Sequence, residues 1–267
     1  MPNYDTSKIR NIVLLGHSQT GKTSLAEAIL FTAGAVKRQG KIEEGNTTSD
    51  YLTDEIQRKT SINLGVLNCF WKNHKINILD TPGYAEFIND IIVATVAADI
   101  AVIVVDASHG IELGTDRAFK IIEEKGLSAA IYLNKMDKER ADFHKTYEAL
   151  VNKYGKKCVV LAAPNGQAKD FKGAINLITK QGIDSLNSDD KAKAEKYREQ
   201  LIEQSAEIDD KLIEKYLETG GLTQEEILAA LKKGIEQGAV IPIICGCSTI
   251  NAQANILLDM LADYFPN

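Results

Sequence analysis

The stretch GHSQTGKT, residues 16–23, decides the fold of this 267-residue chain. It follows an apolar run at residues 11–15 and opens a helical pattern over residues 22–32. This is the pattern GxxxxGK[ST] in the place it requires, between a strand and a helix. There the glycines let backbone N–H groups turn inward around phosphates, and the helix N-terminus favours an anion. We therefore predict a phosphate-binding loop in which Lys22 reaches the β- and γ-phosphates and the Thr23 hydroxyl coordinates Mg²⁺.

A second motif, DTPG at residues 80–83, follows the apolar run 75–79. An aspartate at the carboxyl end of a strand can hold Mg²⁺, directly or through water, opposite Thr23. Gly83 can offer its backbone N–H to a γ-phosphate because it carries no side chain. Downstream of a phosphate-binding loop, this motif indicates a γ-phosphate sensor.

Two further motifs predict guanine as the base. NKMD (residues 134–137) closes the run 129–133, and Asp137 can accept two hydrogen bonds from guanine that adenine cannot supply. Asn134 can bond the base edge, the Lys135 stem can cover the ring, and the backbone amides of GCS (residues 246–248) can bond guanine O6. Such a site rejects the wrong base because its polar groups would be left unpaired. The residues expected to contact GTP or GDP are Gly16, His17, Ser18, Gln19, Thr20, Gly21, Lys22, Thr23, Ser24, Asp80, Thr81, Pro82, Gly83, Tyr84, Asn134, Lys135, Asp137, Gly246, Cys247 and Ser248.

Around the motifs, short apolar runs alternate with helical patterns, which predicts an α/β P-loop fold. We expect a six-stranded, mostly parallel sheet with helices on both faces. The expected strands are 11–15, 62–70, 75–79, 100–106, 129–133 and 240–245, and the expected helices are 22–32, 86–97, 115–124, 142–153 and 251–264. The connecting segment (residues 34–60) is long and polar, which is usual for a functional or mobile loop.

Residues 158–237 do not continue the alternation, so we expect a GTP-binding domain of residues 1–157 and 238–267 with an inserted α+β subdomain. A second helix of the insertion begins at Thr223, where Glu226 completes a capping box. Residues 184–236 hold 14 acidic and 8 basic residues, a balance that equals the net charge of −6 for the whole chain. A solvated helix face and a partner-binding surface both fit this segment. Its first amphipathic helix is indicated by three- and four-residue steps between Tyr197, Leu201, Ser205, Ile208, Leu212 and Tyr216.

Composition excludes several classes of protein. The four cysteines include no CxxC pair, so neither a zinc site nor a disulfide framework is indicated. The polar N-terminus is no signal peptide, and the longest apolar stretch, residues 91–105, is interrupted by Asp99 and too short for a bilayer. We expect a cytoplasmic monomer without a membrane partner. The acidic net charge argues against nucleic-acid binding by this chain alone.

The order of these motifs resembles the translational GTPases, and most of all the GTPase domain of elongation factor G. Residues 34–62 are similar to that family's first switch, residues 80–91 to its second switch, and residues 209–234 to the acidic helices of its G′ insertion. The resemblance implies Ser61 as a further Mg²⁺ ligand, or Thr60 if the register slips by one. It also implies the ribosome as activating partner, with the acidic insertion as a contact for its stalk protein. Because family members continue past the point that matches residue 267, we expect a fragment of a larger multidomain protein.

Two departures from the family pattern concern hydrolysis. Family members usually carry a histidine that positions the attacking water where this chain has Tyr84, and an aspartate where it has Gln19. In this respect the chain resembles elongation factor G-like paralogues. A phenol can orient water by hydrogen bonding but cannot act as an imidazolium. The expected catalytic groups are Tyr84, Lys22 and Gly83.

Three hypotheses follow from the sequence. The first is a slow GTPase that a large partner accelerates. The second is a GTP/GDP occupancy sensor with little or no hydrolysis, which Tyr84 and Gln19 favour. The third, a P-loop ATPase, is disfavoured by Asn134 and Asp137.

Overall fold

The computed structural model describes residues 5–251 and 253–266, so the expected domain ends at residues 1 and 267 lie outside the described residues. Its centre is a seven-stranded sheet in the order β2-β3-β1-β4-β5-β9-β6. All neighbouring strands are parallel except β2, which pairs with β3 in antiparallel fashion. The strands are β1 (Ile9–Leu15), β2 (Gly65–Trp71), β3 (His74–Asp80), β4 (Ile100–Asp106), β5 (Ser128–Asn134), β6 (Cys158–Val160) and β9 (Ile241–Cys245).

The core lies along β1, β4 and β5. Every residue of β4 and β5 is buried, which is typical of parallel strands that are covered on both faces. At the sheet edge, β2 instead alternates buried and exposed residues, because one of its faces is open. The apolar runs therefore place the central strands, and the alternation marks the edge.

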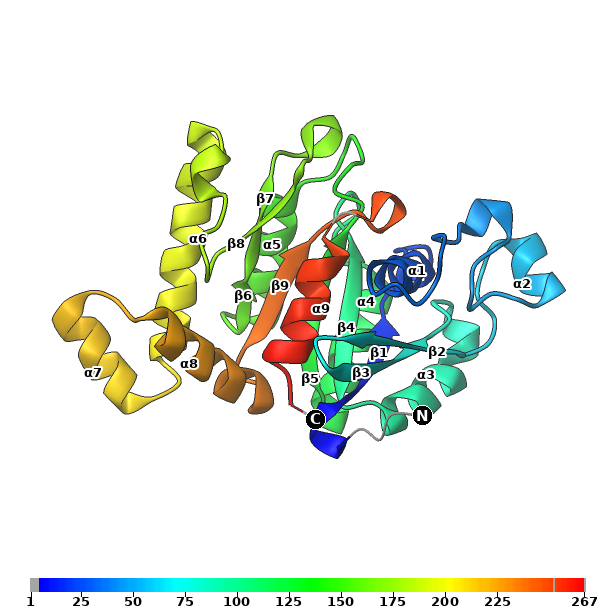
Figure 1. Cartoon of the computed structure of the whole chain (residues 1–267), viewed down its shortest axis with the longest axis horizontal. Helices are drawn as coiled ribbons and strands as arrows, with labels where there is room; N and C mark the ends of the chain where they lie inside the picture. Colours follow the sequence, from blue (N-terminus) through cyan, green and yellow to red (C-terminus); the bar gives the residue numbers. More distant parts are fainter. Residues whose placement is uncertain (1–4, 252, 267) are drawn as a thin grey trace.

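Helices cover both faces of the sheet, as the sequence predicts (Figure 1). Helix α1 (Lys22–Thr32) packs against α9 (Ala254–Asp263), and α3 (Ile88–Ala97) packs against α4 (Leu113–Lys125). Helix α5 (Phe143–Tyr154) contacts β6. Short 3₁₀ turns occupy Thr6–Lys8, Ile42–Glu44, Ala85–Phe87, Ala168–Asp170, Ile183–Ser185 and Ser248–Ile250.

The sheet has one strand more than the six expected. Residues 158–160, which the sequence places at the start of the insertion, form β6 and pair with β9, with Cys158 opposite Ile241. A three-residue strand gives too short a pattern to be recognised, and its partner lies far along the chain. A separate antiparallel pair, β7 (Ala162–Asn165) and β8 (Gly173–Asn176), follows it.

The expected single helix through Tyr197 and Tyr216 is two helices, α6 (Ser188–Ala206) and α7 (Asp210–Thr219). Asp209 causes the break, because its side chain accepts the Lys211 N–H and begins a new helix. The three- and four-residue spacing of the helix-face residues continues across this break, so the sequence pattern does not show it.

Helix α8 (Gln224–Glu236) begins with the predicted capping box of Thr223 and Glu226. Figure 1 shows α6, α7 and α8 at one end of the molecule and the connecting segment, with α2 (Thr53–Arg58), at the other. Among the helices of residues 5–251 and 253–266, none has the length and apolar character needed to cross a bilayer.

Candidate functional site

The four sequence motifs meet at the carboxyl edge of the sheet. GHSQTGKT follows β1, and DTPG, NKMD and GCS begin at or after the last residues of β3, β5 and β9. In open α/β sheets, ligands bind beside the carboxyl ends of the strands where the strand order reverses, here around β1. A cavity of about 370 Å³ lies there. It is lined by Ser18, Gln19, Gly21, Lys22, Thr23, Ser24, Ile42, Glu43, Asp50, Lys59, Thr60, Ser61, Thr81, Gly83, Tyr84, Lys135, Lys138 and Thr249.

The phosphate-binding loop closes around the Lys22 ammonium group. Lys22 Nζ donates to the backbone oxygens of His17 (2.7 Å) and Gly16 (3.3 Å). Burial lowers the pKa of Lys22 to about 8, although the charges of Asp80 and Glu112 oppose the shift. At Gly16, with φ of 144°, a Cβ would lie 2.3 Å from the backbone oxygen of Val104, so only glycine fits. The loop is preformed and positively charged.

Hydroxyl groups gather around the Asp80 carboxylate. Thr23 Oγ1 and Ser49 Oγ donate to Asp80 Oδ2 at 2.8 and 2.9 Å, and Ser61 Oγ lies 2.9 Å from Thr23 Oγ1. Within the described residues Asp80 Oδ1 is buried and has no hydrogen-bond partner. Burial raises the pKa of Asp80 to about 6, against the bonds from Thr23 and Ser49. A buried carboxylate oxygen beside several hydroxyls suits a hard cation such as Mg²⁺, which prefers oxygen ligands. Of the two candidates in the first switch, Ser61 is the one placed within hydrogen-bond distance of Thr23.

The base-recognition end is joined to the phosphate loop by direct hydrogen bonds. Asn134 Nδ2 donates to the Thr20 oxygen at 2.8 Å, and Asn134 Oδ1 accepts the Ser248 N–H at 3.0 Å. The Cys247 thiol donates to Asp137 Oδ1 at 3.0 Å, and burial together with this bond raises the pKa of Cys247. From the sequence we expect the backbone N–H of Ser248 to bond guanine O6. In this structure that N–H donates to Asn134 Oδ1 instead. Ten of the twenty residues expected to contact the nucleotide do not line the cavity: Gly16, His17, Thr20, Asp80, Pro82, Asn134, Asp137, Gly246, Cys247 and Ser248.

Asp106, at the end of β4, is a site residue that the sequence analysis missed. Its Oδ2 lies 2.8 Å from Lys135 Nζ, which also donates to the Gln19 oxygen at 2.7 Å. Burial raises the pKa of Asp106, but hydrogen bonds from Lys135 and Ser108 outweigh it and hold that pKa below its usual value. The position at the carboxyl end of a parallel strand is the signal that could have identified it.

Two buried glutamates hold the connecting segment, and neither belongs to a motif. Glu27 on α1 accepts the Gly40 N–H at Oε2 (2.9 Å) and the Thr48 N–H at Oε1. Glu55 on α2 accepts N–H groups with both oxygens, two of them at Oε1 at 3.0 Å. Asp50, which faces Ser61 in the cavity, was missed as well, and burial raises its pKa against the bond from Ser61. These carboxylates lie in, or contact, a polar segment whose composition gives no sign of their burial.

His17 and Tyr84 lie at the rim of the phosphate loop. His17 Nδ1 accepts the Gly114 N–H at 3.3 Å, and its Nε2 lies 3.6 Å from Glu112 Oε1, so the ring contacts the start of α4. Tyr84 lines the cavity and is 37% exposed. Tyr84 is therefore part of the cavity wall and is accessible to solvent.

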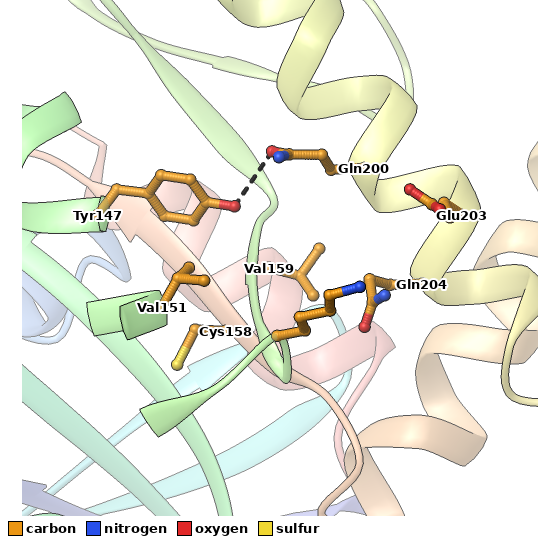
Figure 2. Close-up of a pocket in the computed structure, with 8 residues that line it drawn as sticks. Tyr147, Val151, Cys158, Val159, Gln200, Glu203 and Gln204 are labelled. Carbon is orange, nitrogen blue, oxygen red and sulfur yellow. Dashed lines mark hydrogen bonds between the residues drawn. The ribbon is translucent and has the colours of Figure 1, made fainter. Parts of the chain in front are cut away.

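A second hollow of about 200 Å³ lies between α5, β6 and α6 (Figure 2). Tyr147 donates to Gln200 Oε1 at 3.1 Å across it, and Val151, Cys158 and Val159 line the side opposite α6. It contains none of the motif residues. Residues of the phosphate loop and of DTPG, together with Lys135, line the first cavity instead.

The chain is similar to known proteins over nearly its whole length. Residues 7–267 match the family model described as elongation factor Tu GTP binding domain. Elongation factor G from Thermotoga maritima and that from Thermotoga neapolitana are each 34% identical over 275 residues, which cover 98% of this chain and 40% of theirs. A crystal structure of a protein from Thermus thermophilus has a TM-score of 0.89 at 28% identity, covering 98% of this chain and 41% of that one. The chain spans about two fifths of the length of the relatives it matches. It belongs to the elongation factor Tu GTP-binding-domain family, within the translational GTPases.

Proposed function

We propose that this chain binds GTP and GDP with Mg²⁺ and hydrolyses GTP as a molecular switch. The observation that carries the proposal is the buried Asp80 carboxylate beside the phosphate loop: its Oδ2 accepts from the Thr23 and Ser49 hydroxyls, and its Oδ1 has no hydrogen-bond partner among the described residues. Thr23, Ser61 and Asp80 would hold Mg²⁺, which would neutralise charge on the β- and γ-phosphate oxygens. Family membership supports this assignment.

Hydrolysis is an in-line attack by water on the γ-phosphorus. A new P–O bond forms, the bond to the β–γ bridging oxygen breaks, and GDP and phosphate leave. Lys22 and the loop amides stabilise the charge that develops on the phosphate oxygens. Gly83 approaches that loop so closely that a Cβ on it would lie 2.6 Å from Lys22 Nζ. This closeness to the phosphate loop supports the proposal that the Gly83 N–H contacts the γ-phosphate.

Tyr84 is the candidate group that orients the attacking water. Its place in the cavity wall supports this role. Tyr84→Phe keeps the ring and removes the hydroxyl, so we expect slower turnover with unchanged GTP affinity. Unchanged turnover would remove the phenol from the mechanism.

Guanine selectivity rests on Asn134, the last residue of β5, and on Asp137, which follows that strand. Asn134 donates to the Thr20 oxygen of the phosphate loop, and Asp137 accepts from the Cys247 thiol, so both side chains are held in place. Competition binding tests this assignment. ATP that displaced GTP with similar affinity would contradict it.

The ribosome is the proposed activating partner, by resemblance to elongation factor G. The acidic insertion, with α7 and α8, is the proposed contact for the stalk protein. We further propose that residues 158–237 form the G′ subdomain, that the chain is part of a longer multidomain protein, and that it acts in the cytoplasm as a monomer without binding nucleic acid alone.

GTP turnover with and without ribosomes tests the function as a whole. Unassisted turnover should be on the order of 10⁻⁴ per second, as for unassisted small GTPases. Strong stimulation is the expected result. Tight GTP binding without stimulation, in this chain and in any longer parent, would contradict hydrolysis and favour a protein that signals by nucleotide occupancy.

A further inference from the structure

The side chain of Gln39 joins the connecting segment (residues 34–60) to the loop that follows β9. Its side-chain Nε2 donates a hydrogen bond to the backbone oxygen of Ser248 at 2.6 Å. The two residues are 209 positions apart in the sequence, so the bond exists only when the segment is folded onto the site. Gln39 belongs to none of the motifs that bind phosphate, metal or base.

The backbone next to Gln39 is held by close contacts of Gly40 with Glu27 and Asn46. The Gly40 N–H donates to Glu27 Oε2 at 2.9 Å. A Cβ on Gly40 would lie 2.6 Å from that oxygen and 2.7 Å from the backbone oxygen of Asn46. Because the main chain is fixed this closely against α1, the Gln39 side chain is held at the Ser248 carbonyl group.

The Ser248 peptide leads directly to the groups proposed to bind the nucleotide. Ser248 is buried, and its N–H donates to Asn134 Oδ1 at 3.0 Å. Asn134 in turn donates to the Thr20 oxygen in the phosphate loop at 2.8 Å. A second contact, from Thr32 Oγ1 to Asn251 Oδ1 at 2.8 Å, joins the end of α1 to the same loop. Three hydrogen bonds in sequence therefore join the connecting segment, the base-recognition loop and the phosphate loop.

We propose that Gln39 is a positioning residue that couples folding of the connecting segment to closure of the base-recognition loop, so that a folded segment slows nucleotide release. The proposal rests on the GTP/GDP switch proposed above. A contact made only in the folded state stabilises the segment and the loop by the same free energy, by linkage. The γ-phosphate and Mg²⁺ favour the folded segment through Ser61. Gln39 therefore slows the release of GTP more than it slows the release of GDP.

Dissociation rates test the coupling. Stopped-flow fluorescence would follow release of N-methylanthraniloyl GDP, and of the matching non-hydrolysable GTP analogue, with Mg²⁺ present. Gln39→Ala should release the GTP analogue about fivefold faster, as expected for one lost hydrogen bond, and change GDP release less than about twofold. Gln39→Glu keeps the size of the side chain but cannot donate, so it should behave like the alanine variant. Gln57→Ala is the matched control, because Gln57 is exposed on α2 in the same segment.

The outcomes separate the coupling from the function on which it rests. Equal acceleration of both nucleotides would overturn the proposal, since the contact would then act without regard to the γ-phosphate. Unchanged release in both Gln39 variants would overturn it too. A wild-type chain that bound no guanine nucleotide would instead refute the proposed function, before any variant was compared.

Discussion

Replacing Glu27 by glutamine should loosen the connecting segment without disturbing the core. The two carboxylate oxygens of Glu27 serve different stretches of backbone, Oε2 accepting from Gly40 and Oε1 from Thr48. Glutamine has one oxygen and one NH₂ group, so one of these bonds is lost. There the NH₂ group of the glutamine side chain would face a backbone N–H, and neither group can accept a hydrogen bond.

The size of the effect follows from those contacts. A hydrogen bond to a charged group contributes about 1.5–3 kcal/mol, and the bond that remains becomes a neutral one. We expect the closed segment to lose about 2 kcal/mol relative to the open segment. This corresponds to about a thirtyfold larger open population.

Amide hydrogen exchange measures that population residue by residue. In Glu27→Gln the Gly40 and Thr48 amides should exchange about thirtyfold faster, while the amides of β4 and β5 keep their rates. Glu55→Gln is the matched control, because Oε1 of Glu55 accepts from both Ile62 and Asn63 and the glutamine oxygen can keep both bonds. Only the longer bond from the Leu52 N–H (3.3 Å) is lost. The exchange of the Ile62 and Asn63 amides should rise much less. Equal acceleration in the two variants, or none at Gly40 and Thr48, would refute the reasoning.

Three further predictions concern the rest of the site. A Cβ on Gly114 would lie 2.3 Å from a backbone atom of the phosphate loop, so Gly114→Ala should weaken GDP binding about tenfold, as measured by calorimetry. Gly221→Ala is the control: there is open space around Gly221, so this variant should bind GDP normally. Asp106→Asn should free Lys135 and weaken GDP binding about fivefold. Because the folded pKa of Asp106 is lowered, its stabilisation is complete above the unfolded pKa of about 4 and is lost as pH falls through the folded pKa. Acid unfolding of Asp106→Asn should lack that loss, and identical acid profiles would contradict the assignment. Cys247→Ala should weaken GDP binding about threefold whereas Cys247→Ser, which keeps a donor, should not; equal affinities would show that the thiol has no positioning role.

What could be predicted from the sequence is what local chemistry determines. The phosphate loop has its own glycines and its own helix start, and α1 occupies the predicted residues 22–32. The capping box at Thr223 is equally local. The apolar runs place the central strands, since burial on both faces leaves little else for such segments to form.

What could not be predicted depends on contacts between distant residues. A strand as short as β6 is defined by its pairing with β9, and the break at Asp209 lies inside a continuous apolar period. Likewise, the roles of Glu27 and Asp106 depend on backbone and side chains that reach them only after folding. The role of each of these polar residues depends on the groups that it contacts in the folded chain, and the sequence alone does not show those contacts.

The distribution of these contacts also indicates which part of the site moves. The phosphate loop is joined to the base motifs by Asn134 on one side and by Lys135 on the other, and these two residues lie at the end of a strand that is buried throughout. Movement there would break the bonds of the buried Asn134 amide, which is costly, and those of the partly exposed Lys135 ammonium group. The connecting segment, in contrast, is held by a few side-chain contacts over mostly exposed residues. Opening it releases those few bonds to water and leaves the sheet intact. A nucleotide switch built on this chain must therefore move the connecting segment and leave the phosphate and base motifs together as one unit.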